Sequence, residues 1–237
     1  MQRTIEHNAF GECRITKKAV MKNSGIQIVS LFLLSLIAVA AGYSKHHNSN
    51  QASQGQPGAF DYYLLTLSWS PEFCHGHPQK PECQSGHHGF VLHGLWPQYA
   101  GGGYPENCST APGLSNPFEM ADLMPDAGLV AHEWSTHGTC SGLDAENYFK
   151  LLRQAFTSVK APGRFAAPQE SFSISPQEVK NEFAQSNPNF SAADMTVSCG
   201  NNYLTAVSMC VSKDLKPMAC QNLRDCRATV IRVPPVR

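Results

Sequence analysis

The spacing of apolar residues changes period along the chain and predicts where strands and helices lie. Apolar runs over residues 60–69 and 89–95 predict strands, and runs over 195–199 and 203–212 predict a hairpin around Gly200-Asn201-Asn202. One helical stripe is formed by Tyr148, Leu151, Leu152, Ala155, Phe156 and Val159. Ser175-Pro176-Gln177-Glu178 has the capping-box pattern, which predicts a helix to about Gln185. Because strands and helices mix without regular alternation, we expect an α+β fold.

The first 58 residues lie outside this predicted domain. A basic stretch precedes an apolar run of sixteen residues from Ile26 to Ala41, which ends in small residues. This pattern is typical of a secretory signal peptide, so residues 1–41 are predicted to be removed near Ala40 or Ala41. An uncleaved anchor is the alternative, but the run is shorter than the roughly 20 residues that span a bilayer. Residues 42–58 are polar and aperiodic and predict a flexible leader, which leaves 59–237 as one domain.

The cysteines of the expected mature chain indicate disulfide bonds. Eight of the nine cysteines follow the leader: Cys74, Cys83, Cys108, Cys140, Cys199, Cys210, Cys220 and Cys226. An even number behind a secretory signal is typical of a disulfide framework, although eight cysteines allow 105 pairings. A zinc cluster is the rival interpretation. It is disfavoured because no Cys-x-x-Cys pair occurs and the nearby histidines have no regular ligand spacing.

Two short segments, residues 90–98 and 132–140, carry the candidate chemistry. They hold His93, His132, Glu133 and His137, a set suited to general acid-base catalysis on a phosphodiester. The second segment is close to the His-Glu-x-x-His of zinc proteases but has one residue too many. On a helix, two histidines five residues apart diverge by roughly 140°, which excludes that metal site if the segment is helical. Glu133 and His137 are four residues apart, so we expect the carboxylate to orient this imidazole and favour its protonated form.

His93 lies in a predicted buried strand, where a lone histidine is most often a satisfied core residue. Its neighbours favour a functional role. Gly94 permits close approach of the backbone, and Trp96-Pro97 offers a rigid aromatic surface suited to stacking a nucleobase.

Both segments resemble the two active-site signatures of the ribonuclease T2 family of secreted acid endoribonucleases. The run Phe60-Asp61-Tyr62-Tyr63-Leu64-Leu65-Thr66-Leu67-Ser68-Trp69 resembles the opening strand of this family, and the cysteine-rich tail is also similar. The resemblance therefore extends from about Phe60 to the C-terminus. It implies an α+β fold with a central antiparallel sheet and helices packed beside it. It also implies the disulfides Cys108–Cys140, Cys199–Cys226 and Cys210–Cys220, with Cys74–Cys83 by remainder.

The resemblance assigns roles to six residues of the two segments. His137 corresponds to the general base that deprotonates the ribose 2′-OH, and His93 to the general acid that protonates the departing 5′ oxygen. Glu133 corresponds to the carboxylate that supports the base and the transition state, and His132 to a phosphate-binding imidazole. Trp96 and Gln98 correspond to base-binding positions. The implied reaction is cleavage of RNA through a 2′,3′-cyclic phosphate to a 3′-phosphate, without a metal ion or another cofactor.

Three residues depart from the family pattern. Thr136 stands where the second signature usually has a lysine, so a cation close to the scissile phosphate is missing. Gln98 replaces an acidic base-contacting residue of many members, and Ser68 replaces a glutamine common in plant members. These changes leave the acid-base pair intact but affect the expected rate and base preference. We expect cleavage with low base specificity.

The net charge of the chain indicates which kind of nucleic acid it binds. From Lys45 onward the chain has 13 basic and 16 acidic residues, a net charge of −3 with neutral histidines, and so no broad basic face for duplex binding. We therefore expect a monomer that engages a few nucleotides of single-stranded RNA, not DNA, and no membrane after signal cleavage. Protonation of its histidines below about pH 6 would strengthen RNA binding. Localisation is expected to be secreted or periplasmic, and the sequons at Asn107 and Asn189 matter only in a eukaryotic secretory pathway.

Two other functions remain open at this stage. One is a protein that keeps this fold to recognise RNA, with weak or dispensable activity. The other is a metal-dependent nuclease or protease, which sensitivity to a chelator would reveal.

Overall fold

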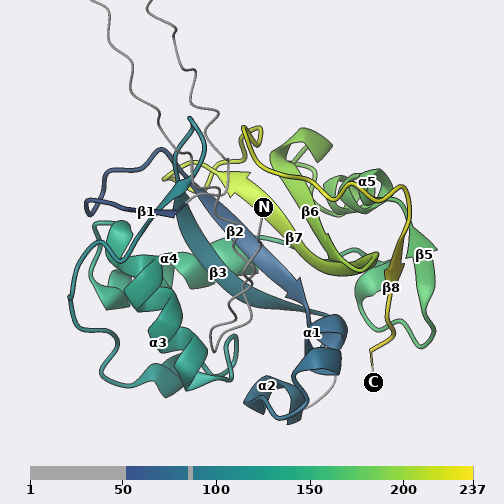
Figure 1. Ribbon diagram of the computed structural model, residues 1–237, viewed down its shortest axis with the longest axis horizontal. Helices are drawn as coiled ribbons and strands as arrows, with labels where there is room; N and C mark the ends of the chain where they lie inside the picture. Colours follow the sequence, from purple (N-terminus) through teal and green to yellow (C-terminus); the bar gives the residue numbers. More distant parts are fainter. Residues whose placement is uncertain (1–51, 85–87, 237) are drawn as a thin grey trace, which may run out of the picture. The chain divides into compact units, whose positions relative to one another are not determined.

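A six-stranded sheet forms the centre of the domain (Figure 1). The computed structural model describes residues 52–84 and 88–236, so the predicted signal peptide lies outside the described residues. The strands are β2 (Tyr62–Trp69), β3 (Phe90–Gln98), β5 (Phe172–Ile174), β6 (Met195–Gly200), β7 (Tyr203–Val211) and β8 (Ile231–Val233). Their order is β3-β2-β7-β8-β5, and β6 also pairs with β7. The pairs are antiparallel except β7–β8, which confirms the expected central antiparallel sheet.

The predicted hairpin of β6 and β7 turns at Asn201 and Asn202, whose φ angles are 50° and 62°. Two consecutive positive φ angles are typical of the type I′ turn that matches strand twist, and asparagine tolerates them well.

The end of the predicted leader is more ordered than its composition indicates. Strand β1 (Ala52–Gln54) pairs in parallel with β4 (Tyr104–Glu106) in a separate two-stranded sheet. The backbone N–H of Gly58 also donates to the carbonyl of Cys140 at 2.9 Å. Backbone pairing needs no apolar side chains, so hydrophobic periodicity does not reveal it. The prediction of a flexible leader to residue 58 therefore does not describe residues 52–58.

Five α-helices and four short 3₁₀ helices lie in the described ranges. The α-helices are α1 (Ser70–Gly76), α2 (Pro81–Gln84), α3 (Ala127–Thr136), α4 (Ala145–Thr157) and α5 (Pro176–Ser186). The 3₁₀ helices are η1 (Pro117–Met120), η2 (Gly138–Cys140), η3 (Gly163–Phe165) and η4 (Ala192–Asp194). Helices α4 and α5 confirm the two predicted helices, and α5 starts with the predicted capping box at Ser175 and Glu178. Within 52–84 and 88–236, no helix has the length and hydropathy to span a membrane.

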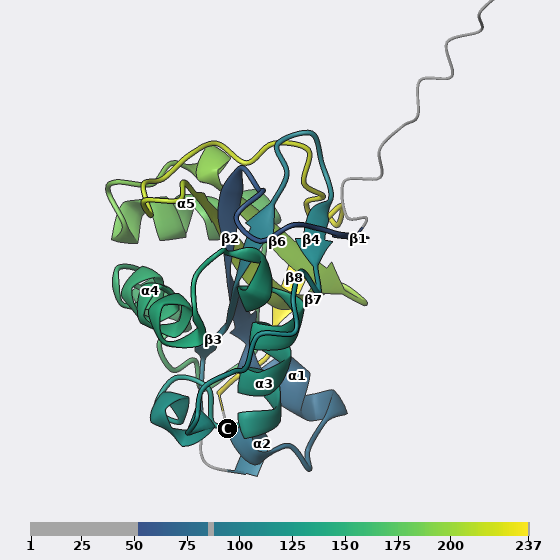
Figure 2. The same cartoon turned by 90° about the vertical axis from the view of Figure 1, so that its left-hand side faces the viewer.

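The two faces of the sheet have different roles. On β2, Tyr63, Leu65, Leu67 and Trp69 belong to the main hydrophobic core, together with residues of α4 and α5 such as Leu152 and Phe183. Figure 2 shows α4 and α5 on the same side of the sheet. The alternate residues Leu64, Thr66 and Ser68 line a cavity on the other face. Residues of β6 and β7 alternate in the same way, because side chains along a strand point to opposite faces. Helices α4 and α5 therefore cover one face, and the cavity lies on the other face, where α1 and the end of α3 flank it.

Four disulfides join the pairs that the family resemblance implied. They are Cys74–Cys83, Cys108–Cys140, Cys199–Cys226 and Cys210–Cys220. The Cys108–Cys140 bond lies at the end of the second signature. Cys140 is the last residue of η2, and this short helix directly follows His137.

Candidate active site

His93 occupies a β-bulge in the edge strand β3. Thr66 of β2 pairs with Gly94 and the next residue, Leu67, pairs with Leu92, so His93 has no partner on β2. A bulge inserts one unpaired residue and changes the direction of its side chain. His93 lines the cavity, whereas its neighbour Leu92 lies in the core.

The orientation of the His93 ring is fixed by Ser68 on the adjacent strand. The Ser68 hydroxyl lies 2.8 Å from Nδ1 of His93. This hydrogen bond leaves Nε2 of the imidazole to face Glu133, whose Oε1 is 3.8 Å away. Ser68 was considered in the sequence only as a departure from the family pattern, and strand pairing is what brings it beside His93.

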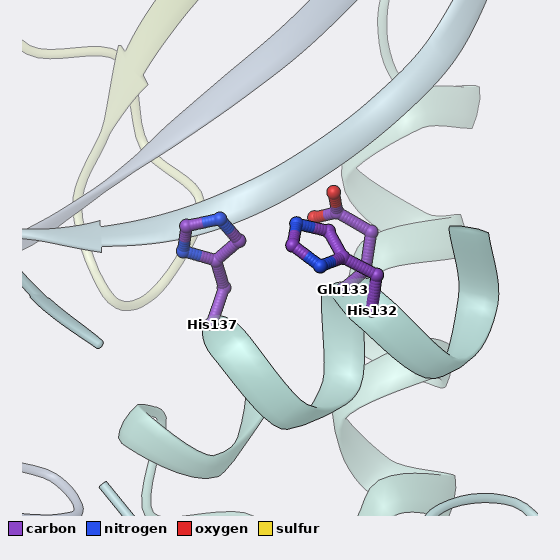
Figure 3. Close-up of side chains that lie close together, drawn as sticks. All are labelled: His132, Glu133 and His137. Atoms are coloured by element: carbon purple, nitrogen blue, oxygen red, sulfur yellow. The ribbon is translucent and has the colours of Figure 1, made fainter. Parts of the chain in front are cut away.

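Glu133 and His132 lie in α3, and His137 is the C-cap residue that follows the last helical residue, Thr136 (Figure 3). Asp126 caps the first turn of α3 by accepting a hydrogen bond from the Gly128 N–H at 2.8 Å. Trp134 packs in the core, so the neighbouring Glu133 is held against the sheet. Figure 3 shows Glu133 and His137 directed toward the strands.

Glu133 is fully buried and is held by Trp96 of β3. The indole Nε1–H of Trp96 donates to Glu133 Oε2 at 2.7 Å. Gly94 makes this contact possible, because a Cβ at that position would lie 2.1 Å from Glu133 Oε2 and 2.3 Å from Trp96 Nε1. The other carboxylate oxygen, Oε1, is buried without a hydrogen-bond partner among the described residues. It is the oxygen that faces His93.

Glu133 was expected to orient His137 and favour its protonated form, but the structure shows no hydrogen bond between these two side chains. Helix α3 ends at Thr136, and His137 adopts φ −114° and ψ −47°, which departs from regular helical geometry. Its Nδ1 is buried without a hydrogen-bond partner in the part of the chain that the structure describes. Glu133 instead contacts Trp96 and His93, so the four-residue spacing did not predict the partner of this carboxylate.

The same helix end changes the metal argument. With His137 outside the regular helix, the 140° divergence does not apply, and the rings of His132 and His137 are 6.2 Å apart. One donor atom from each of His132, Glu133 and His137 lies within 4.8 Å of the others. Among the described residues, these three form a group that could contact a cation, so the spacing of the two histidines does not exclude a metal ion here.

Burial favours the neutral form of each ionisable group in the centre of the site. It raises the pKa of Glu133 to about 8, and the hydrogen bond from Trp96 acts in the opposite direction. It lowers the pKa of His137 to about 3, with further lowering by the nearby His132 and His93. Burial and His132 also lower the pKa of His93. A bound phosphodiester would bring negative charge to these imidazoles and favour their protonated forms.

The site opens into a cavity of about 810 Å³ that also contains the predicted base-binding residues. The Trp96 ring lies 5.1 Å from both the His93 and the His137 rings. Gln98 lines the cavity although it is nearly buried. Tyr104 of β4, which the sequence did not indicate, also lines it, with its ring 6.2 Å from that of His137.

His132 lies at the exposed surface of α3, beside Thr136. The Thr136 hydroxyl is 3.3 Å from Nδ1 of His132. The structure thus brings together all six predicted site residues and adds Ser68 and Tyr104. Neither Ser68 nor Tyr104 belongs to the two signatures. The sequence predicted strands at residues 60–69 and 89–95, and pairing of these two strands is the signal that could have placed Ser68 near His93.

The Ribonuclease T2 family model matches residues 60–226. The chain belongs to the ribonuclease T2 family. A ribonuclease of Aeromonas hydrophila is 43% identical over 117 residues, which cover 48% of this chain and 53% of that relative. Ribonuclease DdI of Dictyostelium discoideum is 26% identical over 213 residues, covering 81% of this chain and 91% of that relative. The chain thus aligns with about half of the first relative and most of the second.

Solved structures of ribonuclease T2-like proteins share the fold. The RNase-related protein from Calystegia sepium is 20% identical and has a TM-score of 0.63, with 75% of this chain and 98% of that chain covered. RNase NT, solved in complex with 5′-AMP, is 22% identical and has a TM-score of 0.56, with 74% and 98% covered.

Proposed function

We propose that this chain cleaves single-stranded RNA with His137 as the general base and His93 as the general acid. The family supports an endoribonuclease activity, and we propose that this activity needs no metal ion. The observation that supports the assignment of roles is the meeting of two imidazoles and a buried carboxylate beside one cavity. RNA as the substrate agrees with the nucleotide bound to the related RNase NT.

In the first step the ribose 2′ oxygen attacks the adjacent phosphorus while His137 accepts its proton. The bond between phosphorus and the 5′ oxygen breaks, and His93 gives its proton to that oxygen. The products are a 2′,3′-cyclic phosphate and a free 5′-OH. In the second step water attacks the cyclic phosphate, the proton roles reverse, and a 3′-phosphate forms. A positioned acid or base typically contributes about 10²- to 10⁴-fold to the rate.

The remaining residues support these two histidines. Ser68 holds Nδ1 of His93, so that Nε2 is free to serve the leaving oxygen. Glu133 faces Nε2 of His93 and helps to orient this imidazole, and His132 binds a phosphate oxygen. Trp96 and Gln98, at the wall of the same cavity, bind the base of the nucleotide that provides the 2′-OH.

The lowered imidazole pKa values support an acid optimum for this activity. Catalysis requires one histidine neutral and the other protonated, which produces a bell-shaped pH profile. Because the pKa values of His93 and His137 are both below the ordinary imidazole value of about 6.5, the window with one proton shared by the pair lies at acid pH.

We also propose that the mature enzyme acts as a monomer in an extracellular or periplasmic compartment. Its four disulfides need an oxidising environment, which supports this location. DNA is not a substrate in this proposal, since it lacks the attacking hydroxyl.

Digestion of defined substrates tests the proposal. The purified protein should cut RNA in the presence of a chelator, release cyclic phosphate, and leave DNA and 2′-O-methyl RNA intact. His93→Ala and His137→Ala should each lower kcat by about 10²- to 10⁴-fold in a folded protein. His88→Ala is the matched control with a dinucleotide substrate, because His88 does not line the active-site cavity. DNA cleavage, or a folded His93→Ala protein with near-parental activity, would contradict the proposed roles.

A further inference from the structure

A second cavity continues from the active site. Its volume is about 560 Å³, within the range of roughly 300–1,000 Å³ typical of ligand pockets. Its lining includes Tyr203 of β7, Ser171, His88 and the C-terminal Pro234 and Pro235. Glu72, His75 and Asn201 line both cavities, so a flexible ligand in the first can extend into the second without leaving the surface of the protein.

Strand register places the second cavity on the His93 side of the active site. Along β2, Leu64 pairs with Trp96, whereas Ser68 pairs with Val91 and contacts His93. Helix α1, which supplies Glu72 and His75, begins immediately after β2. The order along the groove is therefore Trp96, then His93, then the shared residues, then the second cavity.

This order sets a polarity for bound RNA, given the acid and base roles assigned under the proposed function. The nucleotide with the attacking 2′-OH lies at Trp96, and the leaving 5′ oxygen lies at His93. The leaving group carries the 3′ part of the substrate. We propose that the second cavity is a subsite for nucleotides on the 3′ side of the cleaved bond, beyond the leaving nucleotide.

The lining of the second cavity suits a nucleotide. The Tyr203 ring offers a flat surface for base stacking. The Arg232 guanidinium lies over this ring, with its central carbon 5.9 Å from the ring centroid. Arg232 is exposed, so its charge is available to a phosphate. Nε2 of His88 is buried without a hydrogen-bond partner among the described residues, and it can pair with a polar group of the ligand. The carboxyl oxygens of Glu72 at the junction accept hydrogen bonds and therefore suit a base amino group better than a phosphate there.

Substrates of defined length and polarity test the inference. Each contains one ribonucleotide at the cleavage position, and all other sugars are 2′-fluoro, which removes the attacking hydroxyl elsewhere. Starting from the dinucleotide, adding two nucleotides on the 3′ side should raise kcat/KM by about fivefold or more, the effect of one stacked base. The same addition on the 5′ side should change kcat/KM by less than twofold. An equal gain on both sides, or a gain confined to the 5′ side, would overturn the inference.

Two matched pairs of variants locate the effect. Ser171→Glu places a negative charge in the second cavity and should remove most of the 3′ gain, whereas Gln169→Glu adds the same charge on the same exposed loop outside the lining and should preserve it. Tyr203→Ala should also remove the gain, and Tyr203→Phe should retain it, because the ring is what stacks. A 3′ gain that survives both Ser171→Glu and Tyr203→Ala would show that it arises elsewhere.

The dinucleotide itself separates this inference from the proposed function. All four variants should cleave it at the parental rate, since their residues lie outside the acid-base site. If the parent protein does not cleave the dinucleotide or any longer substrate, the proposed function fails. If it cleaves the dinucleotide but shows no 3′ gain, only the subsite fails.

Discussion

At the scale of single residues, Thr136 is the departure from the family pattern with the clearest chemical consequence. A lysine at this position would offer a charge to the phosphate, and a hydrogen bond to a charged group is worth about 1.5–3 kcal/mol. Thr136 offers one neutral hydroxyl, which the structure places 3.3 Å from Nδ1 of His132. This contact orients the His132 ring, and we infer that His132 carries more of the phosphate stabilisation here than in relatives with the lysine.

A double-mutant cycle tests this compensation. Thr136→Lys should raise kcat and broaden the optimum toward neutral pH, because a lysine stays charged over a wider pH range than an imidazole. His132→Ala should lower kcat by about 10-fold or more in the parent but less in the Thr136→Lys background. Ser135→Lys is the control, since it adds the same charge one residue earlier on the exposed surface of α3. Strictly additive effects of the two substitutions would mean that His132 does not compensate.

At the scale of elements, the Cys108–Cys140 disulfide holds the end of α3. It closes a separation of 32 residues, and the Asn107 N–H donates to the Thr136 carbonyl at 2.9 Å beside it. Cys199–Cys226 closes a similar separation of 27 residues and joins β6 to the segment before β8, neither of which carries a catalytic histidine. In the chain-entropy model each link contributes roughly 3–4 kcal/mol.

Replacing either pair of cysteines by serine should therefore lower the free energy of unfolding in urea by a similar amount. Only loss of Cys108–Cys140 should also lower kcat at a temperature where both variants are folded, because it releases the segment that carries His137. Equal effects of the two replacements on kcat would show that the disulfide has no positioning role.

Local periodicity predicted the elements that carry their own pattern and missed those that depend on distant partners. The strand at residues 60–69, the β6–β7 hairpin and helices α4 and α5 follow from repeats of 2 and 3.6 residues. The short strands β5 and β8 and the parallel β7–β8 pair have no such signal. The active site shows the same difference between features with a local sequence pattern and features that depend on distant contacts. Its histidines could be named from the sequence, but the contact of Glu133 with Trp96 and His93 depends on where α3 ends and how it docks on β3.

At the scale of the whole molecule, the buried Glu133 couples stability to pH. Its pKa is raised from 4.5 to about 8 in the folded state, so the unfolded chain loses this proton at lower pH than the folded one. This contribution to stability is therefore present below pH 4.5 and is lost as the pH rises toward 8. The lowered pKa values of His93 and His137 act in the opposite direction and reduce stability as the pH falls below the ordinary imidazole range.

Glu133→Gln isolates the carboxyl contribution. We expect the variant to be inactive, to have a Tm close to the parent near pH 4, and to exceed the parent Tm by several degrees at pH 8. Glu178→Gln is a control of opposite sign, because hydrogen bonds from Ser175 lower the pKa of that exposed cap residue. A Tm difference between Glu133→Gln and the parent that does not grow with pH would refute this coupling.

His93, the proposed general acid, is not required for strand pairing, because it occupies a bulge in β3. Leu92 and Gly94 already pair with consecutive residues of β2, so a chain without His93 would form an uninterrupted ladder between the two strands. The histidine is in effect an insertion that the sheet tolerates at its edge. Selection for stability alone would be free to delete it, and its presence is explained by chemistry.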